Sequence, residues 1–283
     1  MKYNIEPGLE HIKKLHISVF RDARGVYNEF SRKYGQKKAH EIVDNLLDAA
    51  DQSQQELYKK KNADYDIAML FSGGYDADIV RRSCNWIFDH RDSFGDEILE
   101  IGCDCGFITT FLGSLFPEKH ITAIERIEEG IEIAKKNVEK FGLSNIDFIC
   151  GDVTELKDKQ FDTVFSMRTM QENGDDVEEH GLNELKELAE KYKQAKEQYA
   201  SAIVSLVKEG GTLISIERIG FNSLFLAWLQ NLINQGLFYN THNQINCREV
   251  GNDKTFQAMI FNKKIGNTQN AYDIFINCFI MVQ

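Results

Sequence analysis

The chain has 283 residues, 42% of them hydrophobic and 27% charged, which is typical of a globular protein with a full core. No apolar run approaches the ~20 residues that span a bilayer, and the first residues lack the pattern of a secretory signal, so we expect a cytoplasmic protein. The net charge of −11 disfavours nucleic acid as a partner, because proteins that bind nucleic acid neutralise its phosphates with positive charge.

The N-terminal part of the sequence is helical in its apolar pattern and basic in its first 40 residues. These 40 residues hold nine Lys and Arg against four Asp and Glu, which indicates either a basic face for an acidic partner or a solvated helix surface. Gly35 and Ser72-Gly73-Gly74 predict breaks between about three helices, the last from Asp76 to His90. We therefore expect residues 1–94 to form a helical cap or lid region.

From residue 95 the pattern changes to short apolar runs that alternate with helical segments. The strand-like runs are 97–101, 121–125, 146–150, 161–166 and 212–217, and the helical segments include 127–141, 183–207 and 222–236. Such alternation predicts an α/β fold with a doubly wound, mostly parallel sheet in residues 95–283. Two further runs, 244–250 and 255–261, flank a Gly251-Asn-Asp turn that predicts a hairpin. The apolar tail 274–282 is expected to be a last strand or helix.

The turn Glu100-Ile-Gly-Cys-Asp-Cys-Gly106 joins the first apolar run to a helical segment. Glycines let a ligand approach the backbone closely, and the free N–H groups of a helix that begins there favour a binding crevice. Glu125 ends the next apolar run, nineteen residues after Gly106. This spacing is close to the ~20 residues expected of an acid that binds ribose hydroxyls. The sequence therefore predicts a cofactor that contains a nucleoside.

These motifs, with Cys150-Gly-Asp-Val153, Phe161-Asp-Thr-Val-Phe-Ser166 and Gly210-Gly-Thr-Leu213, resemble those of the class I S-adenosylmethionine-dependent methyltransferases over residues 95–263. The resemblance implies a Rossmann-like sheet of seven strands with a terminal hairpin, S-adenosylmethionine as cofactor and S-adenosylhomocysteine as product. Asp104 stands where the family has its middle glycine, and aspartate tolerates a left-handed backbone better than most residues. The cofactor-binding residues that the resemblance implies are Glu100, Gly102, Cys103, Asp104, Gly106, Glu125, Arg126, Asp152, Val153 and Ser166.

Side chains that follow the fourth and fifth strand-like runs are expected to line the acceptor pocket. Glu217 is the first candidate for positioning or deprotonating the acceptor, with Arg168 as a second catalytic candidate, and an ion pair of Glu217 with Arg168 or Arg218 is the structural alternative. The acceptor is expected to be an oxygen, nitrogen or other nucleophile of a small molecule, a protein or a peptide. We expect no metal, because Cys103 and Cys105 lack a second pair at ligand spacing.

Two other interpretations remain open at this stage. Ser72-Gly-Gly-Tyr-Asp76 resembles the phosphate-binding loop of ATP pyrophosphatases, although Ala77 stands where that family has serine. Alternatively, the chain is a non-catalytic subunit that keeps the cofactor-binding fold, which Asp104 in the glycine-rich turn suggests. The N-terminal helices or the helix 183–207 would then bind a partner, and the same helices are candidates for a homodimer contact.

Overall fold

The computed structural model describes residues 6–156, 159–173, 177, 184–220, 222–264 and 268–280. The helices before the first strand are α1 (Pro7–Lys14), α2 (Ala23–Tyr34), α3 (Gln36–Gln52), α4 (Gln54–Asn62), α5 (Tyr65–Asp89) and the short η1 (Arg91–Ser93). The later helices are α6 (Phe107–Leu115), α7 (Glu128–Phe141), η2 (Val153–Glu155), α8 (Leu185–Ser205), α9 (Ser223–Asn234) and α10 (Ala271–Ile280). The strands are β1 (Glu97–Ile101), β2 (His120–Glu125), β3 (Ile146–Cys150), β4 (Phe161–Met167), β5 (Val207–Glu217), β6 (Leu237–Glu249) and β7 (Asn252–Lys263).

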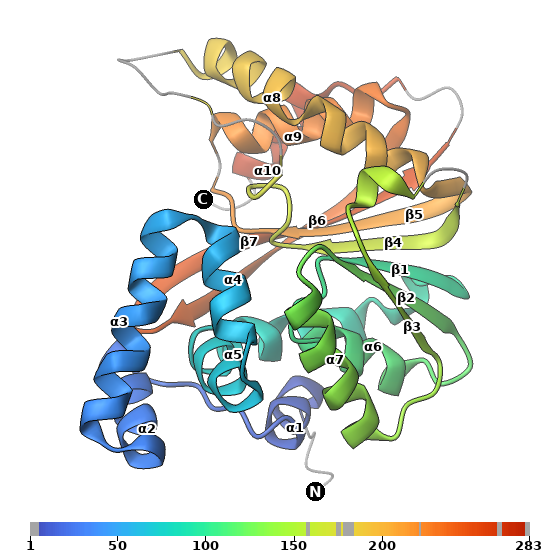
Figure 1. Ribbon diagram of the computed structural model, residues 1–283. Helices are drawn as coiled ribbons and strands as arrows, with labels where there is room; N and C mark the ends of the chain where they lie inside the picture. The colour runs from blue at the N-terminus through green and yellow to red at the C-terminus, as the bar shows by residue number, and fades with distance from the viewer. Residues whose placement is uncertain are drawn as a thin grey trace, which may run out of the picture. The chain divides into compact units, whose positions relative to one another are not determined.

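The strands form one sheet in the order β3-β2-β1-β4-β5-β7-β6 (Figure 1). β3 runs parallel to β2, β1 to β4 and β4 to β5, whereas β7 is antiparallel to β5. The predicted α/β fold with a mostly parallel, seven-stranded sheet is confirmed. β5 and β6 begin earlier than predicted, at Val207 and Leu237, and the described part of the apolar tail lies in the helix α10.

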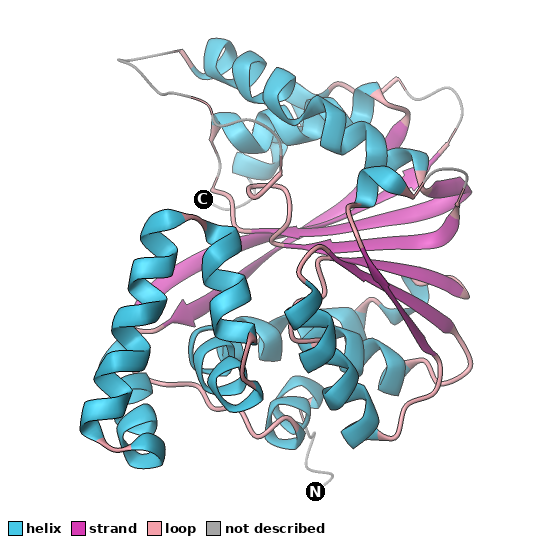
Figure 2. Cartoon of the chain, viewed as in Figure 1, coloured by secondary structure: helices cyan, strands magenta, loops and turns pink. Residues whose placement is uncertain are grey.

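The first of two compact units contains Met1–Arg91, Cys103–Gly151 and Asn246–Lys254. Helices dominate it (Figure 2): α1 packs on α5, α4 on α7, and α5 on α6. His11 of α1 donates a hydrogen bond from Nε2 to the carbonyl oxygen of Phe107 at 2.6 Å. Burial lowers the pKa of His11 to about 4, so the ring is neutral at physiological pH. This contact fixes the first residue of α6.

Helix α5 is continuous through Ser72, Gly73 and Gly74, so the break predicted there is wrong. A Cβ added to Gly73 would lie 2.5 Å from Cγ2 of Ile17, and one added to Gly74 would lie 2.9 Å from Cγ1 of Val26. The glycines therefore allow α5 to pack closely against α2 and the segment that precedes it. This packing outweighs the ~1 kcal/mol by which a glycine destabilises a helix interior.

The second compact unit contains Asp92–Gly102, Asp152–Ile245 and Thr255–Gln283. Helices α8, α9 and α10 lie together on one side of the strands of this unit (Figure 1). Tyr199 of α8 stacks on Trp228 of α9, with ring centroids 6.1 Å apart. The apolar side of α8 is thus used within its own unit, and residue 183, where the helix was expected to begin, lies outside the described residues. Among the described helices, none is both long and apolar enough to cross a bilayer.

Candidate functional site

The turn between β1 and α6 contains three residues with positive φ. The values are 74° at Gly102, 41° at Asp104 and 73° at Gly106. Asp104 therefore adopts the left-handed conformation that the sequence analysis expected of it. Gly106 is the N-cap of α6, so the unbonded N–H groups of the first helical turn follow directly.

Gly106 also packs closely against α7, where an added Cβ would lie 2.7 Å from Cβ of Ala134. We expect Gly106→Ala to lower the free energy of unfolding by more than the roughly 1–3 kcal/mol of backbone strain alone. Gly142→Ala is the matched control, because Gly142 has a φ of 66° and no atom within 4 Å of its added Cβ. Urea unfolding followed by circular dichroism measures both variants. Equal losses of stability would contradict the close packing at Gly106.

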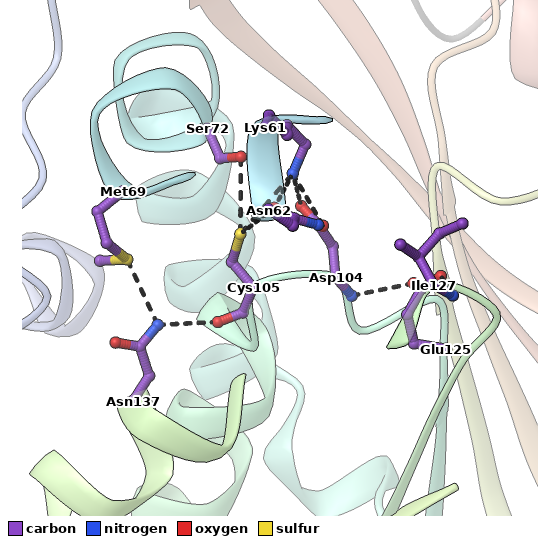
Figure 3. A network of polar contacts seen from close by, with 9 residues as sticks. All are labelled: Lys61, Asn62, Met69, Ser72, Asp104, Cys105, Glu125, Ile127 and Asn137. Atoms are coloured by element: carbon purple, nitrogen blue, oxygen red, sulfur yellow. Dashed lines mark hydrogen bonds and ion pairs between the residues drawn. The ribbon is translucent and has the colours of Figure 1, made fainter. Parts of the chain in front are cut away.

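Glu125, the last residue of β2, is bonded to this turn (Figure 3). Its Oε2 accepts the N–H of Asp104 at 3.1 Å, and its Oε1 accepts the N–H of Ile127 at 3.0 Å. Burial and, to a smaller extent, the nearby carboxylate of Asp104 raise the pKa of Glu125 above its ordinary value. The acid that was expected to bind ribose is therefore oriented by the backbone of the glycine-rich turn.

The carboxylate of Asp104 lies in a network with the end of α4 (Figure 3). Lys61 Nζ donates to Oδ1 and Oδ2 of Asp104 at 2.9 and 2.8 Å, and Asn62 Nδ2 donates to Oδ1 at 2.7 Å. The side chain of Lys61 is only 4% exposed, and that of Asp104 is 25% exposed. Burial disfavours both charges, but their attraction holds the pKa of Asp104 below, and that of Lys61 above, its ordinary value.

Sequence reasoning missed Lys61 and Asn62. Lys61 ends the run Lys59-Lys60-Lys61 of α4, and such a run is usually a solvated helix face. The one signal in the sequence was the acid at a glycine position, because a carboxylate in a buried turn needs a cation or several hydrogen-bond donors.

Cys105 and Asn137 extend the same network to α5 and α7 (Figure 3). Asn137 Nδ2 donates to the carbonyl oxygen of Cys105 at 2.9 Å, and the hydroxyl of Tyr65 donates to Asn137 Oδ1 at 2.6 Å. Burial raises the pKa of the Cys105 thiol to about 12, so it stays protonated and is a poor nucleophile. These bonds fix the backbone of the turn from the side of the N-terminal helices.

Further residues expected to bind the cofactor lie in β1 or just after β2 and β3. Asp152 Oδ1 accepts the N–H and the hydroxyl of Thr154 at 2.8 and 2.7 Å, which caps η2. Val153 is buried and Arg126, after β2, is exposed. Glu100 is buried in β1, where it pairs in register with Phe165 of β4.

Glu217, the last residue of β5, is fully buried. Ser166 and Ser215 donate from Oγ to its Oε1 at 3.4 and 3.3 Å, and the N–H of Met170 donates to its Oε2 at 3.3 Å. Burial raises the pKa of Glu217 to about 8, so the group is protonated at neutral pH. In the part of the chain that the structure describes, Glu217 is thus bonded to two hydroxyl groups and a backbone N–H, and it does not form the ion pair with Arg168 or Arg218 that was the structural alternative.

The segment after β4 is held by β5 and α8. Arg168 has a φ of 60°, which is uncommon outside glycine, and its N–H donates to the carbonyl oxygen of Ile216 at 2.9 Å. The hydroxyls of Thr169 and Tyr199 are bonded at 2.6 Å. A Cβ added to Gly102 would lie 2.7 Å from Cγ2 of Thr169, so this segment packs directly against the first glycine of the turn.

Ser72–Asp76 does not form a phosphate-binding loop. The segment lies inside α5, where backbone N–H groups are bonded within the helix. The ATP pyrophosphatase interpretation is therefore wrong. Within the described residues, no group of three or more His, Cys, Asp and Glu side chains is arranged to hold a metal ion.

Comparison with known sequences decides the family. The sequence model of a family described as a methyltransferase domain matches residues 92–275. The chain belongs to this methyltransferase family. The resemblance to the class I S-adenosylmethionine-dependent methyltransferases is thereby confirmed.

Two curated relatives are malonyl-[acyl-carrier protein] O-methyltransferases. The protein from Priestia megaterium is 41% identical over 75 residues, which are 26% of this chain and 26% of the relative. The protein from Bacillus anthracis is 36% identical over 92 residues, 32% of this chain and 30% of the relative. The chain thus matches about a quarter to a third of the length of these relatives.

A solved structure with a related fold is that of magnesium protoporphyrin IX methyltransferase from Synechocystis, which has S-adenosylmethionine bound. The Synechocystis protein is 15% identical in sequence to the present chain, and the two structures superpose with a TM-score of 0.45. The superposition covers 64% of this chain and 81% of that one.

Proposed function

We propose that the protein is an S-adenosylmethionine-dependent methyltransferase that acts on an oxygen, nitrogen or other nucleophile of a small molecule, a protein or a peptide. One observation carries the proposal: in a chain of the methyltransferase family, the N–H of the left-handed Asp104 holds the carboxylate of Glu125. Family membership supports the reaction, and an acid oriented beside a glycine-rich turn supports a donor that contains adenosine.

The residues of the turn fit this donor. Gly102 is exposed and has no side chain, so its backbone is open to a ligand. We propose that Glu125 accepts hydrogen bonds from the ribose hydroxyls, and that Asp152 accepts one from the adenine amino group beside Arg126 and Val153. The further residues proposed to hold the donor are Glu100, Gly102, Cys103, Asp104 through its backbone, Gly106 and Ser166.

When bound, S-adenosylmethionine supplies a methyl group that its sulfonium already activates. The protein then has to align the acceptor and exclude water, which is catalysis by proximity in a desolvated site. We propose that Glu217 acts as a neutral group that positions the segment after β4, because its Oε2 accepts the N–H of Met170. Arg168, fixed by its backbone bond to Ile216, is proposed to orient the acceptor from this segment.

The first acceptor class to assay is an oxygen nucleophile. The curated relatives named above are O-methyltransferases that act on malonyl-[acyl-carrier protein], which supports a carboxylate on a carrier-bound acyl group. The basic residues among the first 40 of the chain would suit an acidic carrier protein, because complementary charge speeds encounter. Asp104 no longer favours a non-catalytic subunit, since Lys61 and Asn62 compensate its charge.

Calorimetric titration with S-adenosylhomocysteine tests the assignment of the donor site. We expect Glu125→Ala and Asp152→Ala each to weaken binding by about 1–3 kcal/mol, because each strands hydrogen-bond donors of the ligand. Asp147→Ala is the control, since this side chain of β3 is 76% exposed. Unchanged affinity in both site variants would overturn the assignment.

A further inference from the structure

The turn of this chain differs from the family pattern at one position, and the structure shows how the difference is accommodated. Asp104 has a φ of 41° at the position where the resemblance predicts a glycine. Its carboxylate turns towards α4, where both oxygens are bonded to Lys61 and one is also bonded to Asn62 (Figure 3). The side chain therefore does not project freely from the turn.

The surroundings of the Lys61 ammonium favour its ion pair with Asp104. Its ammonium has three strong acceptors, which are the two oxygens of Asp104 and, at 2.8 Å, Oδ1 of Asn62. The ring of Tyr58, 4.7 Å away, covers another side of the charge. Removing one partner of a pair this buried leaves the other charge uncompensated, so Lys61 and Asp104 depend on each other.

The pair is connected directly to Glu125, the acid at the end of β2. The N–H of Asp104 donates to Oε2 of Glu125, and Gly130 in the first turn of α7 lies close to Asn62 and Asp104. A Cβ added to Gly130 would lie 3.2 Å from Nδ2 of Asn62 and 3.4 Å from the carbonyl oxygen of Asp104. The side chain of Asp104 is therefore held by α4 and its backbone N–H by Glu125, while α7 approaches both closely at Gly130.

We infer that Lys61 is a positioning residue for the cofactor: through Asp104 it fixes the left-handed turn and, through the N–H of Asp104, the carboxylate of Glu125. The inference rests on the proposed function. At this position a buried ion pair with the end of α4 stabilises the left-handed backbone that a glycine adopts without strain. Lys61 acts through Asp104 and is not itself a ligand of the donor.

The test is calorimetry with S-adenosylhomocysteine on the full chain and four variants. We expect Lys61→Met to weaken binding about tenfold or more, because it leaves the carboxylate of Asp104 without its cation and releases the turn. The double variant Lys61→Met/Asp104→Gly restores a glycine and removes both charges, and it should bind within about threefold of wild type. Lys60→Met, on the exposed side of α4, is the control and should bind as wild type does.

Asp104→Asn keeps the shape of the side chain and one oxygen acceptor for Lys61, but it leaves the Lys61 ammonium without its countercharge. Its affinity for S-adenosylhomocysteine should be several-fold lower than that of wild type. If Lys61→Met does not fold, Asp104→Asn and the double variant still test the inference. A double variant that binds as weakly as Lys61→Met would show that Lys61 does not act through Asp104, and wild-type affinity in Lys61→Met or Asp104→Asn would show that the pair does not position the turn. Either result overturns the inference. A wild-type chain that binds no S-adenosylhomocysteine would instead overturn the proposed function.

Discussion

Glu217→Gln is expected to remove a large dependence of stability on pH. The wild-type side chain is fully buried, and burial raises its pKa from 4.5 to about 8. Between these values the folded protein holds a proton that the unfolded chain releases. The stabilisation is complete below pH 4.5 and is lost as the pH rises through about 8. At about 1.4 kcal/mol per pKa unit it amounts to roughly 5 kcal/mol.

Glutamine is the matched replacement, because it has the shape of the neutral acid and does not titrate. We expect the free energy of unfolding of Glu217→Gln, relative to wild type, to increase by several kcal/mol between pH 5 and pH 9. His11 acts in the opposite direction, since its lowered pKa of about 4 means stability lost as the pH falls below 6.5. Its effect is common to both proteins and cancels. Urea unfolding at pH 5, 7 and 9 measures the difference, and parallel profiles would show that Glu217 is not held neutral.

The same variant separates the two roles that the sequence analysis left open for Glu217. Glutamine still accepts the N–H of Met170, so a positioning role predicts that methyl transfer near pH 7 is largely kept. A role as proton acceptor predicts a fall in kcat with unchanged affinity for the donor, because an amide cannot take up the proton.

Lys61→Met is expected to lower the free energy of unfolding by roughly 3 kcal/mol. Removing one partner of a buried ion pair leaves the other charge uncompensated, and a loss of about 3–5 kcal/mol is usual. We place this variant at the lower end, because Asp104 is 25% exposed and keeps its bond from Asn62. Urea unfolding of wild type, Lys61→Met, Asp104→Gly and Lys61→Met/Asp104→Gly gives the coupling energy of the pair. Additive losses would mean that the two side chains do not stabilise each other.

The sheet could be predicted from the sequence because its strands are short apolar runs separated by strong local signals. The helical segment expected at 127–141, for example, is followed by Gly142, which ends α7 with a φ of 66°. Ser72-Gly73-Gly74 misled for the opposite reason. Two adjacent glycines usually indicate a break in a helix. Here they lie inside α5, because the close contacts with Ile17 and Val26, more than forty residues away in the sequence, leave no room for a side chain.

The candidate site was predictable only where its residues lie at the ends of strands. Glu125 could be found from its spacing to the glycine-rich turn, but Lys61 could not, because the fold brings it to Asp104 from 43 residues away. Glu217 was found as an acid at a strand end. Its neutral state depends on burial beside Ser166 and Ser215, which no local pattern reveals.

The structure of the chain determined in complex with S-adenosylhomocysteine tests the central claim most directly. The account predicts a nucleoside against the turn that begins at Gly102, with the ribose hydroxyls bonded to Glu125 and the adenine amino group bonded to Asp152. A nucleoside bound elsewhere, or one that makes no contact with Glu125, would contradict it.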